Sequence, residues 1–213
     1  MCLFCFSGDK LESDEAKGKY GAAYGKYADN EEKFDITMCQ APCSEPGCYC
    51  ASMLCFVCAQ VHLRKKALNH LNPGSGWSDY LCCQGVFGGC CCLQPGNMGE
   101  QSCPCCCMCL EACACPGMAI SASRAIIMDR YNLGLDEDDV RLIRCNNCLQ
   151  ILALCASCLN ICIDFEGDDL VVGIINAIAD IVFFCVSGCM TAQVNREINK
   201  RGTEAPQSNA MTR

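Results

Sequence analysis

Four cysteines in the C-terminal part of the sequence have the spacing of metal ligands. Cys145 and Cys148 form one closely spaced pair, and Cys185 and Cys189 form another. Structural zinc is usually held by two such pairs of thiolate or imidazole ligands. Both pairs lie at similar distances from a turn near Gly167, so an antiparallel helical hairpin would bring them to the same depth. The spacing predicts a zinc site, with packing as small core residues as the alternative.

A second set of candidate ligands lies earlier in the chain. Cys55, Cys58 and His62 are spaced to share one face of a helix, where two thiolates and an imidazole could bind zinc. The fourth ligand would come from Cys82, Cys83 or a cysteine between residues 103 and 115. The alternative is that His62 is a solvent-exposed or packed histidine with no ligand role.

Seven cysteines crowd residues 103 to 115. Four of them, Cys103, Cys106, Cys109 and Cys113, match the spacing of a bacterial ferredoxin cluster, but Ala114 stands where that pattern has proline. Chance matches are expected in so dense a tract, so an iron–sulfur cluster is the minor alternative here.

The sequence offers little support for catalysis. A cysteine nucleophile needs a base, and the only histidines are His62 and His70, with no recognisable motif around them. No phosphate-binding loop or dinucleotide fingerprint is present either. We therefore expect a protein that is not an enzyme.

Composition indicates an intracellular protein. The chain has 213 residues, 27 of them cysteine, and a net charge of -8. Its first residues lack the basic leader and apolar run of a secretory signal, and its adjacent cysteines would mispair under oxidising conditions, so we expect reduced thiols and no secretion. The acidic balance argues against nucleic-acid binding, and we interpret the basic cluster Arg64 to Lys66 as a solvated helix end.

Two cysteines at the extreme N-terminus suggest a lipid anchor. Cys2 and Cys5 stand among Leu3, Phe4 and Phe6, an arrangement like that of paired palmitoylation sites, and two acyl chains anchor more stably than one. The alternative is an apolar terminus with no modification.

Helical periodicity predicts an all-α fold. We expect a polar tail over residues 1–33, a single cysteine-rich helical domain over residues 34–201 and a polar tail over residues 202–213. Helices are predicted over 48–68, from 103, after 116 to 131, over 140–163 and over 170–201, with a Gly/Cys-rich loop region over 80–101.

The last two predicted helices should form an antiparallel pair. Polar residues recur along one face of each, including Asn146 and Gln150 in the first and Asn176 and Asp180 in the second. The cysteines opposite, Cys155, Cys158 and Cys162, are expected to be core residues. Residues 170–190 are also long enough to cross a bilayer, although a central aspartate makes insertion marginal.

Three segments resemble the cysteine-rich placenta-specific-eight family, which includes plant cell-number regulators and cadmium-resistance proteins. They are Cys103-Pro104-Cys105, Asp129 to Leu133, and the stretch from Cys189 through Gln193 to Ile198, so the resemblance covers at most residues 39–201. It implies a small, membrane-associated, often oligomeric protein linked to size control or divalent-metal handling. It also implies that Cys-Pro-Cys lies at the bilayer.

Two functions follow from the sequence. The first is a non-enzymatic protein that binds structural zinc and acts as an interaction or scaffold module on the cytoplasmic face of a membrane, with protein partners or self-association. The second is a membrane-spanning oligomer that transports or sequesters divalent cations, with Asp180 and Asn176 lining the path.

Overall fold

Helices make up the fold, as predicted. A computed structural model describes residues 27, 30–87, 94–162 and 168–203, and it is 74% helical with seven α-helices and no strand in that part of the chain. They are α2 (Ala41–Ser44), α3 (Pro46–Leu54), α4 (Phe56–Leu71), α5 (Pro104–Ala114), α6 (Pro116–Tyr131), α7 (Glu137–Cys162) and α8 (Asp168–Thr203), with a 3₁₀ turn, η2 (Cys82–Gly85).

Prolines set several helix starts. Pro46, Pro104 and Pro116 stand in the first turns of α3, α5 and α6, where the missing N–H costs no hydrogen bond and the fixed φ suits the helix. α6 ends at Asn132, which adopts the left-handed conformation that asparagine tolerates. The starts predicted near residues 103 and 116 are confirmed.

The helix predicted over residues 48–68 is wrong as a single element. The chain breaks at Cys55, whose φ of -142° and ψ of 80° are not helical, and this residue separates α3 from α4. Both halves pack against α8. The sequence does not predict this break, because apolar residues continue on both sides of it and neither proline nor glycine occurs there.

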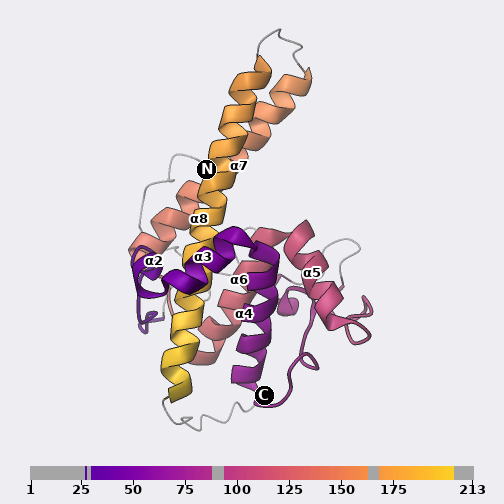
Figure 1. The fold of residues 1–213 in the computed structure, drawn as a ribbon, viewed down its shortest axis with the longest axis vertical. Coiled ribbons are helices and arrows are strands. Elements are labelled where there is room, and N and C mark those ends of the chain that lie inside the picture. Colours follow the sequence, from indigo (N-terminus) through magenta and orange to yellow (C-terminus); the bar gives the residue numbers. More distant parts are fainter. Residues whose placement is uncertain (1–26, 28–29, 88–93, 163–167, 204–213) are drawn as a thin grey trace.

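α6 forms the centre of a compact helical domain. It contacts α4, α5 and α8, and half of its residues are buried, among them Ile120, Ile127 and Met128. α8 runs through this domain and continues beyond it, where it pairs with α7 to form a hairpin that projects away from the other helices (Figure 1). The two helices at the C-terminal end of the chain are thus the antiparallel pair that the sequence predicts.

The domain begins earlier than residue 34. Tyr27 is buried, and its hydroxyl proton is shared between the Asp129 carboxylate at 2.9 Å and the Ala125 carbonyl at 3.2 Å. Glu32 forms a parallel bridge with Leu133. Gly134 is required there, since a Cβ at this position would lie 2.3 Å from a backbone oxygen of residue 30. The predicted tail over residues 1–33 therefore includes residues that pack on α6.

Candidate functional site

The interface between α7 and α8 is lined by polar side chains. The Gln150 amide donates a hydrogen bond to the Ala179 carbonyl at 2.8 Å, and the Asn176 amide donates one to the Ser157 hydroxyl at 3.2 Å. Gln150 and Ser157 of the polar stripe of α7 and Asn176 of the stripe of α8 therefore face the other helix, whereas Asp180 is exposed. In a water-soluble hairpin the apolar faces would meet and the polar faces would be solvated.

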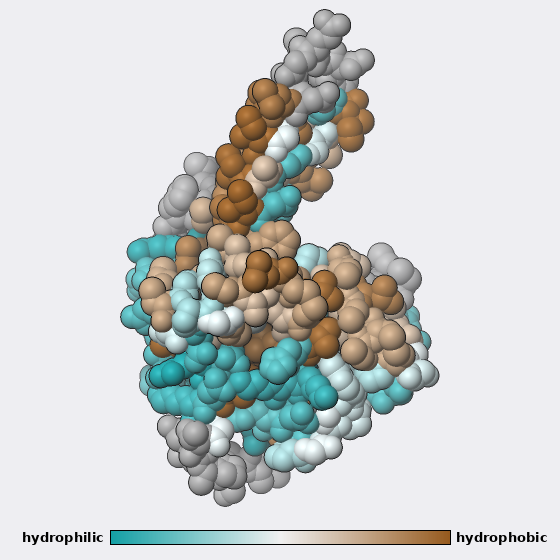
Figure 2. Space-filling model, viewed as in Figure 1, coloured by the Kyte–Doolittle hydropathy of each residue, from teal (hydrophilic) through white to brown (hydrophobic). Residues whose placement is uncertain are grey.

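The outer face of the hairpin is apolar and exposed. Eleven large hydrophobic side chains on it are exposed: Ile151, Leu152, Leu154, Leu159, Ile161, Leu170, Val171, Ile174, Ile178, Ile181 and Phe184. Figure 2 shows this surface as a brown column rising from a domain whose opposite end is hydrophilic. Among the described residues two helices are long and apolar enough to cross a membrane, Glu137–Ile161 and Leu170–Gly202. α5 and α6 together meet the same test only as a span bent by 120°, and α6 lies in the domain core.

Charge is distributed unevenly along the hairpin. No Lys, Arg or His occurs between Cys145 and Asn195, whereas Arg141, Arg144 and Arg196 flank the base of the hairpin. The sequence that joins the two helices at the far end, from Asp164 to Asp169, contains four acidic residues. Arginine therefore occurs at the base of the hairpin and is absent from its arms and its tip.

The corner between α3 and α4 adds apolar surface beside the base of the hairpin. Phe56 of α4 contacts the rings of Phe183 and Phe184 of α8, with centroids 6.0 and 6.2 Å apart. Leu54, at the end of α3, is 88% exposed, and Met53 is exposed beside it. A band of apolar colour runs across the domain over α3 and α5 at this level (Figure 2). The apolar surface thus extends from the hairpin onto the adjoining side of the domain.

The first predicted metal set does not converge in the structure. The contacts between α7 and α8 place Cys145 level with Cys185, but Cys189 lies a further helical turn along α8. Cys148 is disulfide-bonded, so its sulfur is already engaged. Within the described residues these four sulfurs do not form a group of ligand atoms all within 4.8 Å of one another.

Cys155 and Cys158 are exposed, so their prediction as core residues is wrong. The reason is that Gln150 and Ser157, on the polar face of α7, contact α8, so the opposite face of α7, which carries these cysteines, points away from α8. The Cys162 side chain, like Cys2 and Cys5, lies outside the described residues.

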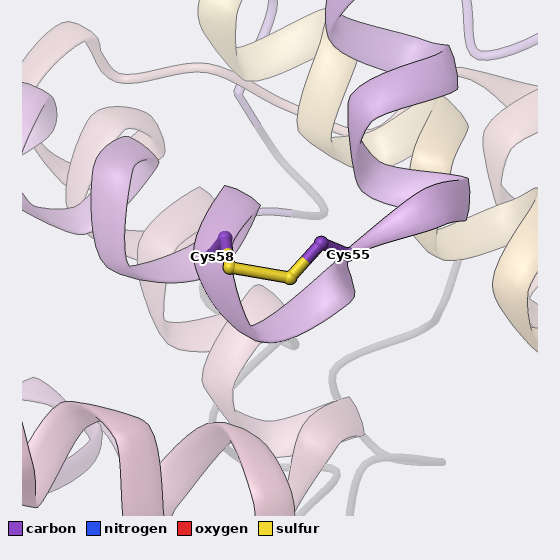
Figure 3. Close-up of a disulfide and its surroundings, with 2 residues drawn as sticks. All are labelled: Cys55 and Cys58. Atoms are coloured by element: carbon purple, nitrogen blue, oxygen red, sulfur yellow. A yellow bond between two sulfur atoms is a disulfide. The ribbon is translucent and has the colours of Figure 1, made fainter.

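The second predicted metal set surrounds a pocket. Cys55 and Cys58 are joined by a disulfide at the start of α4 (Figure 3), which differs from the expected pair of reduced thiols. They line an open pocket of about 480 Å³ together with His62, Cys48 and the α8 side chains Thr191 and Asn195. His62 follows Cys58 by one helical turn and is exposed. The structure thus brings the three predicted residues to one site and adds Cys48.

A buried polar cluster joins α4, α5 and η2. Arg64 and Glu111 form an ion pair of 2.8 Å with side chains that are 0% and 1% exposed. The second carboxylate oxygen of Glu111 accepts hydrogen bonds from the Tyr80 hydroxyl and the Cys83 backbone N–H, both at 2.8 Å. Arg64 also donates to the Ser123 hydroxyl at 2.9 Å. The interpretation of Arg64 as a solvated helix end is therefore wrong.

Cys82, Cys83 and Glu111 place three potential ligand atoms within 4.8 Å of one another, the only such group among the described residues. Burial, and then the charge of Glu111, raises the pKa of both thiols. Both carboxylate oxygens already have partners. A cation here would have to displace two thiol protons and compete with Arg64, so the cluster acts first as a structural junction.

A second buried ion pair joins α6 to α7, and a hydrogen bond from α8 reaches it. Arg124 of α6 lies 2.6 Å from Asp139 of α7, and both side chains are fully buried. Asp139 also accepts hydrogen bonds from the Gln193 amide at 2.9 Å and the Met38 backbone N–H at 2.8 Å. In the sequence Asp139 is one of four consecutive acidic residues at the start of α7, and only its contact across the fold distinguishes it from its neighbours.

The fold and these sites define an all-α, cysteine-rich protein with a hairpin that is apolar enough to cross a membrane. Comparison with protein-family models, curated proteins and solved structures found no match. The resemblance to the placenta-specific-eight family stays a prediction.

Proposed function

We propose that this protein is a membrane-embedded, cysteine-rich interaction module, held in the bilayer by the α7–α8 hairpin. The observation that carries this proposal is the inverted polarity of the hairpin. Polar side chains form hydrogen bonds between the helices, from Asn176 to Ser157 and from Gln150 to the Ala179 carbonyl, while large apolar side chains are exposed on the outside. Lipid is the environment that accepts such an outer face, because hydrocarbon solvates apolar side chains and leaves polar groups to pair internally.

The dimensions of the hairpin support insertion to the far side of the bilayer. The exposed apolar part of α8, from Leu170 to Phe184, rises about 22 Å, against a hydrocarbon core of about 30 Å. The apolar corner at Leu54 and Met53 would lie in the membrane–water interface next to the domain, which shortens the part of the hydrocarbon core that the hairpin has to cross. The acidic tip then reaches water on the far side.

The charges support one orientation. Lys and Arg concentrate in cytoplasmic segments of membrane proteins, and here they flank the base of the hairpin and are missing from its tip. The helical domain would therefore lie on the cytoplasmic side, where it is free to bind partner proteins. Acylation of Cys2 and Cys5 would add to this anchor and is not required for it.

One observation favours the second candidate function, a membrane-spanning oligomer that moves or sequesters divalent cations. Asp180 is exposed on α8, one helical turn from Asn176. A carboxylate facing lipid is costly, and such residues commonly meet a polar partner on another helix or line a water-filled path. Association of several hairpins through Asp180 would provide that environment. Asn176, the other predicted path residue, is instead paired with Ser157.

Topology mapping tests the main proposal. The sequence contains no Asn-x-Ser/Thr acceptor for glycosylation, so an introduced acceptor gives no background. A long Gly/Ser-rich loop carrying Asn-Gly-Thr, inserted at Gly167 in the full chain, should be glycosylated on expression with microsomes. The same loop inserted at Gly74, in the turn after α4, should not be.

Extraction separates insertion from acyl anchoring. The protein should stay with membranes in alkaline carbonate both before and after hydroxylamine, which cleaves thioesters. Suppose that carbonate releases the protein after hydroxylamine and that the acceptor at Gly167 is not glycosylated. The protein would then be held at the membrane by its acyl chains and not by the hairpin.

A further inference from the structure

We infer that the pocket beside the Cys55–Cys58 disulfide is a redox-gated zinc site, closed in the oxidised protein and opened by reduction. Its ligands would be the thiolates of Cys48, Cys55 and Cys58 and the imidazole of His62. The inference assigns the zinc binding predicted from sequence to one pocket and makes it depend on the redox state of a disulfide. It does not depend on how the hairpin lies in the bilayer.

The first support is that four side chains of the right kind line one pocket. Cys48 comes from α3, while Cys55, Cys58 and His62 come from the junction and first turns of α4. Three cysteines and one histidine are a common set for structural zinc, and a Cys-x2-Cys pair is a usual half of it. Cys48 supplies the ligand that spacing alone leaves unassigned.

The second support is the position of the disulfide. Cys55 is the residue that precedes α4 and Cys58 lies in its first turn, with their Cα atoms 5.4 Å apart. Both cysteines are exposed, so a small thiol can reach them. The backbone N–H groups at the start of a helix favour a thiolate, which is the form that binds metal.

The disulfide and the metal exclude each other. Sulfurs joined to one another lie about 2 Å apart and have no thiolate charge to donate, whereas two sulfurs on one tetrahedral zinc lie roughly 3.8 Å apart. In the oxidised state described here the four side chains do not bring their ligand atoms within 4.8 Å of one another. Cleavage of the S–S bond frees both side chains to turn toward Cys48 and His62.

The chemistry balances with a cellular monothiol such as glutathione. Two monothiols reduce the Cys55–Cys58 bond to two thiols and leave as their own disulfide, with two electrons and two protons transferred. Zinc then displaces the protons of up to three thiols as it binds. A disulfide oxidant reverses both steps and releases the metal.

Neighbouring contacts hold the pocket walls in place. Thr191, on the α8 wall, donates to the Ser187 carbonyl at 2.7 Å and accepts from the Gln60 amide at 2.9 Å. Asn195, also on α8, is bonded to Lys66 and Glu45. These bonds fix the α8 wall against α3 and α4, so the opening of the disulfide need not disturb the helices.

The test measures zinc bound to the full-length protein in detergent. Protein reduced with a phosphine is loaded with Zn²⁺, freed of excess metal and examined by native mass spectrometry. A parallel sample is first oxidised with glutathione disulfide. We expect one zinc per chain more in the reduced sample than in the oxidised one.

Variants assign the metal to this pocket. Cys48→Ser and Cys55→Ser should each lose that zinc under reducing conditions. Cys50→Ser is the matched control, because Cys50 lies on the same helix as Cys48, is exposed and does not line the pocket. Circular dichroism checks that all variants stay folded.

The outcomes separate two failures. If reduced wild-type protein binds no zinc, both the predicted zinc binding and this inference are wrong. If it binds zinc and the Cys48 and Cys55 variants retain as much as Cys50→Ser, zinc binding stands and this pocket is not its site. A zinc content unchanged by glutathione disulfide would overturn the redox control.

Discussion

Reversing the polarity of one exposed residue of the hairpin should test whether the hairpin enters the membrane. The eleven exposed apolar residues of the hairpin contribute about -0.3 to -0.6 kcal/mol each on the insertion scale, or about -3 to -7 kcal/mol together. Asp180 opposes them by about 3 kcal/mol. The net insertion free energy is therefore small, and one charge can change its sign.

Ile178→Lys and Asp180→Leu form a matched pair two residues apart on α8. The lysine variant loses one favourable contribution and adds an unfavourable one, so insertion should weaken by about 3.5 kcal/mol. The leucine variant should strengthen insertion by a similar amount, because it removes the charge of Asp180. These values correspond to changes of more than a hundredfold in the insertion equilibrium.

The fraction of chains glycosylated at the tip acceptor measures this equilibrium. We expect Ile178→Lys to abolish most modification and Asp180→Leu to bring it close to completion. Ser78→Lys, an exposed substitution in the domain, controls for added charge and should leave the fraction unchanged. Equal glycosylation of all three variants would refute the argument from outward-facing apolar residues.

Three further predictions concern the domain. Glu111→Gln should lower the free energy of unfolding by about 3 to 5 kcal/mol in chemical denaturation, because it leaves the Arg64 charge buried without its partner. Gly188→Ala should lower the free energy of unfolding by about 1 to 3 kcal/mol, since the new Cβ would lie 3.0 Å from a tyrosine ring of α3. In Gly173→Ala the new Cβ meets nothing within 4 Å, so this variant should be slightly more stable to heat than wild type. Hydrogen bonds from Lys200 and Arg196 of α8 lower the pKa of Asp35. The stability that Asp35 contributes is therefore present at neutral pH and lost as the pH falls below about 4. Asp35→Asn should be less stable than wild type by under about 1 kcal/mol at pH 7 and equally stable in acid.

The helices could be predicted because local signals define them. Proline at the starts of α5 and α6, and helical periodicity through α7 and α8, determine those elements with little help from the rest of the fold. The break at Cys55 could not be predicted, because packing of α3 and α4 on α8 decides it and no local breaker marks it.

The direction of the polar stripes could not be predicted from periodicity. Periodicity finds two opposite faces of a helix, but it does not say which of them meets a neighbour. Gln150 and Asn176 are equally consistent with a solvated face and with an interhelical one, and the structure selects the second. The exposure of Cys155 follows from the same choice.

The candidate pocket was predicted in part. Spacing brought Cys55, Cys58 and His62 together, since all three belong to one local segment. Cys48 was missed because its approach depends on the angle between α3 and α4, and Arg64 was misread because only its distant partner Glu111 explains its burial. Contacts between elements are what sequence spacing leaves out.

α8 is a single uninterrupted helix of 36 residues, about 54 Å long, with no proline to act as a hinge. Its first half carries the apolar surface of the hairpin, and its second half supplies Thr191 and Asn195 to the wall of the pocket. Such a helix behaves as a lever. In the proposed membrane arrangement, a change in bilayer thickness that tilts the first half of α8 would also tilt the second half, and the pocket wall with it.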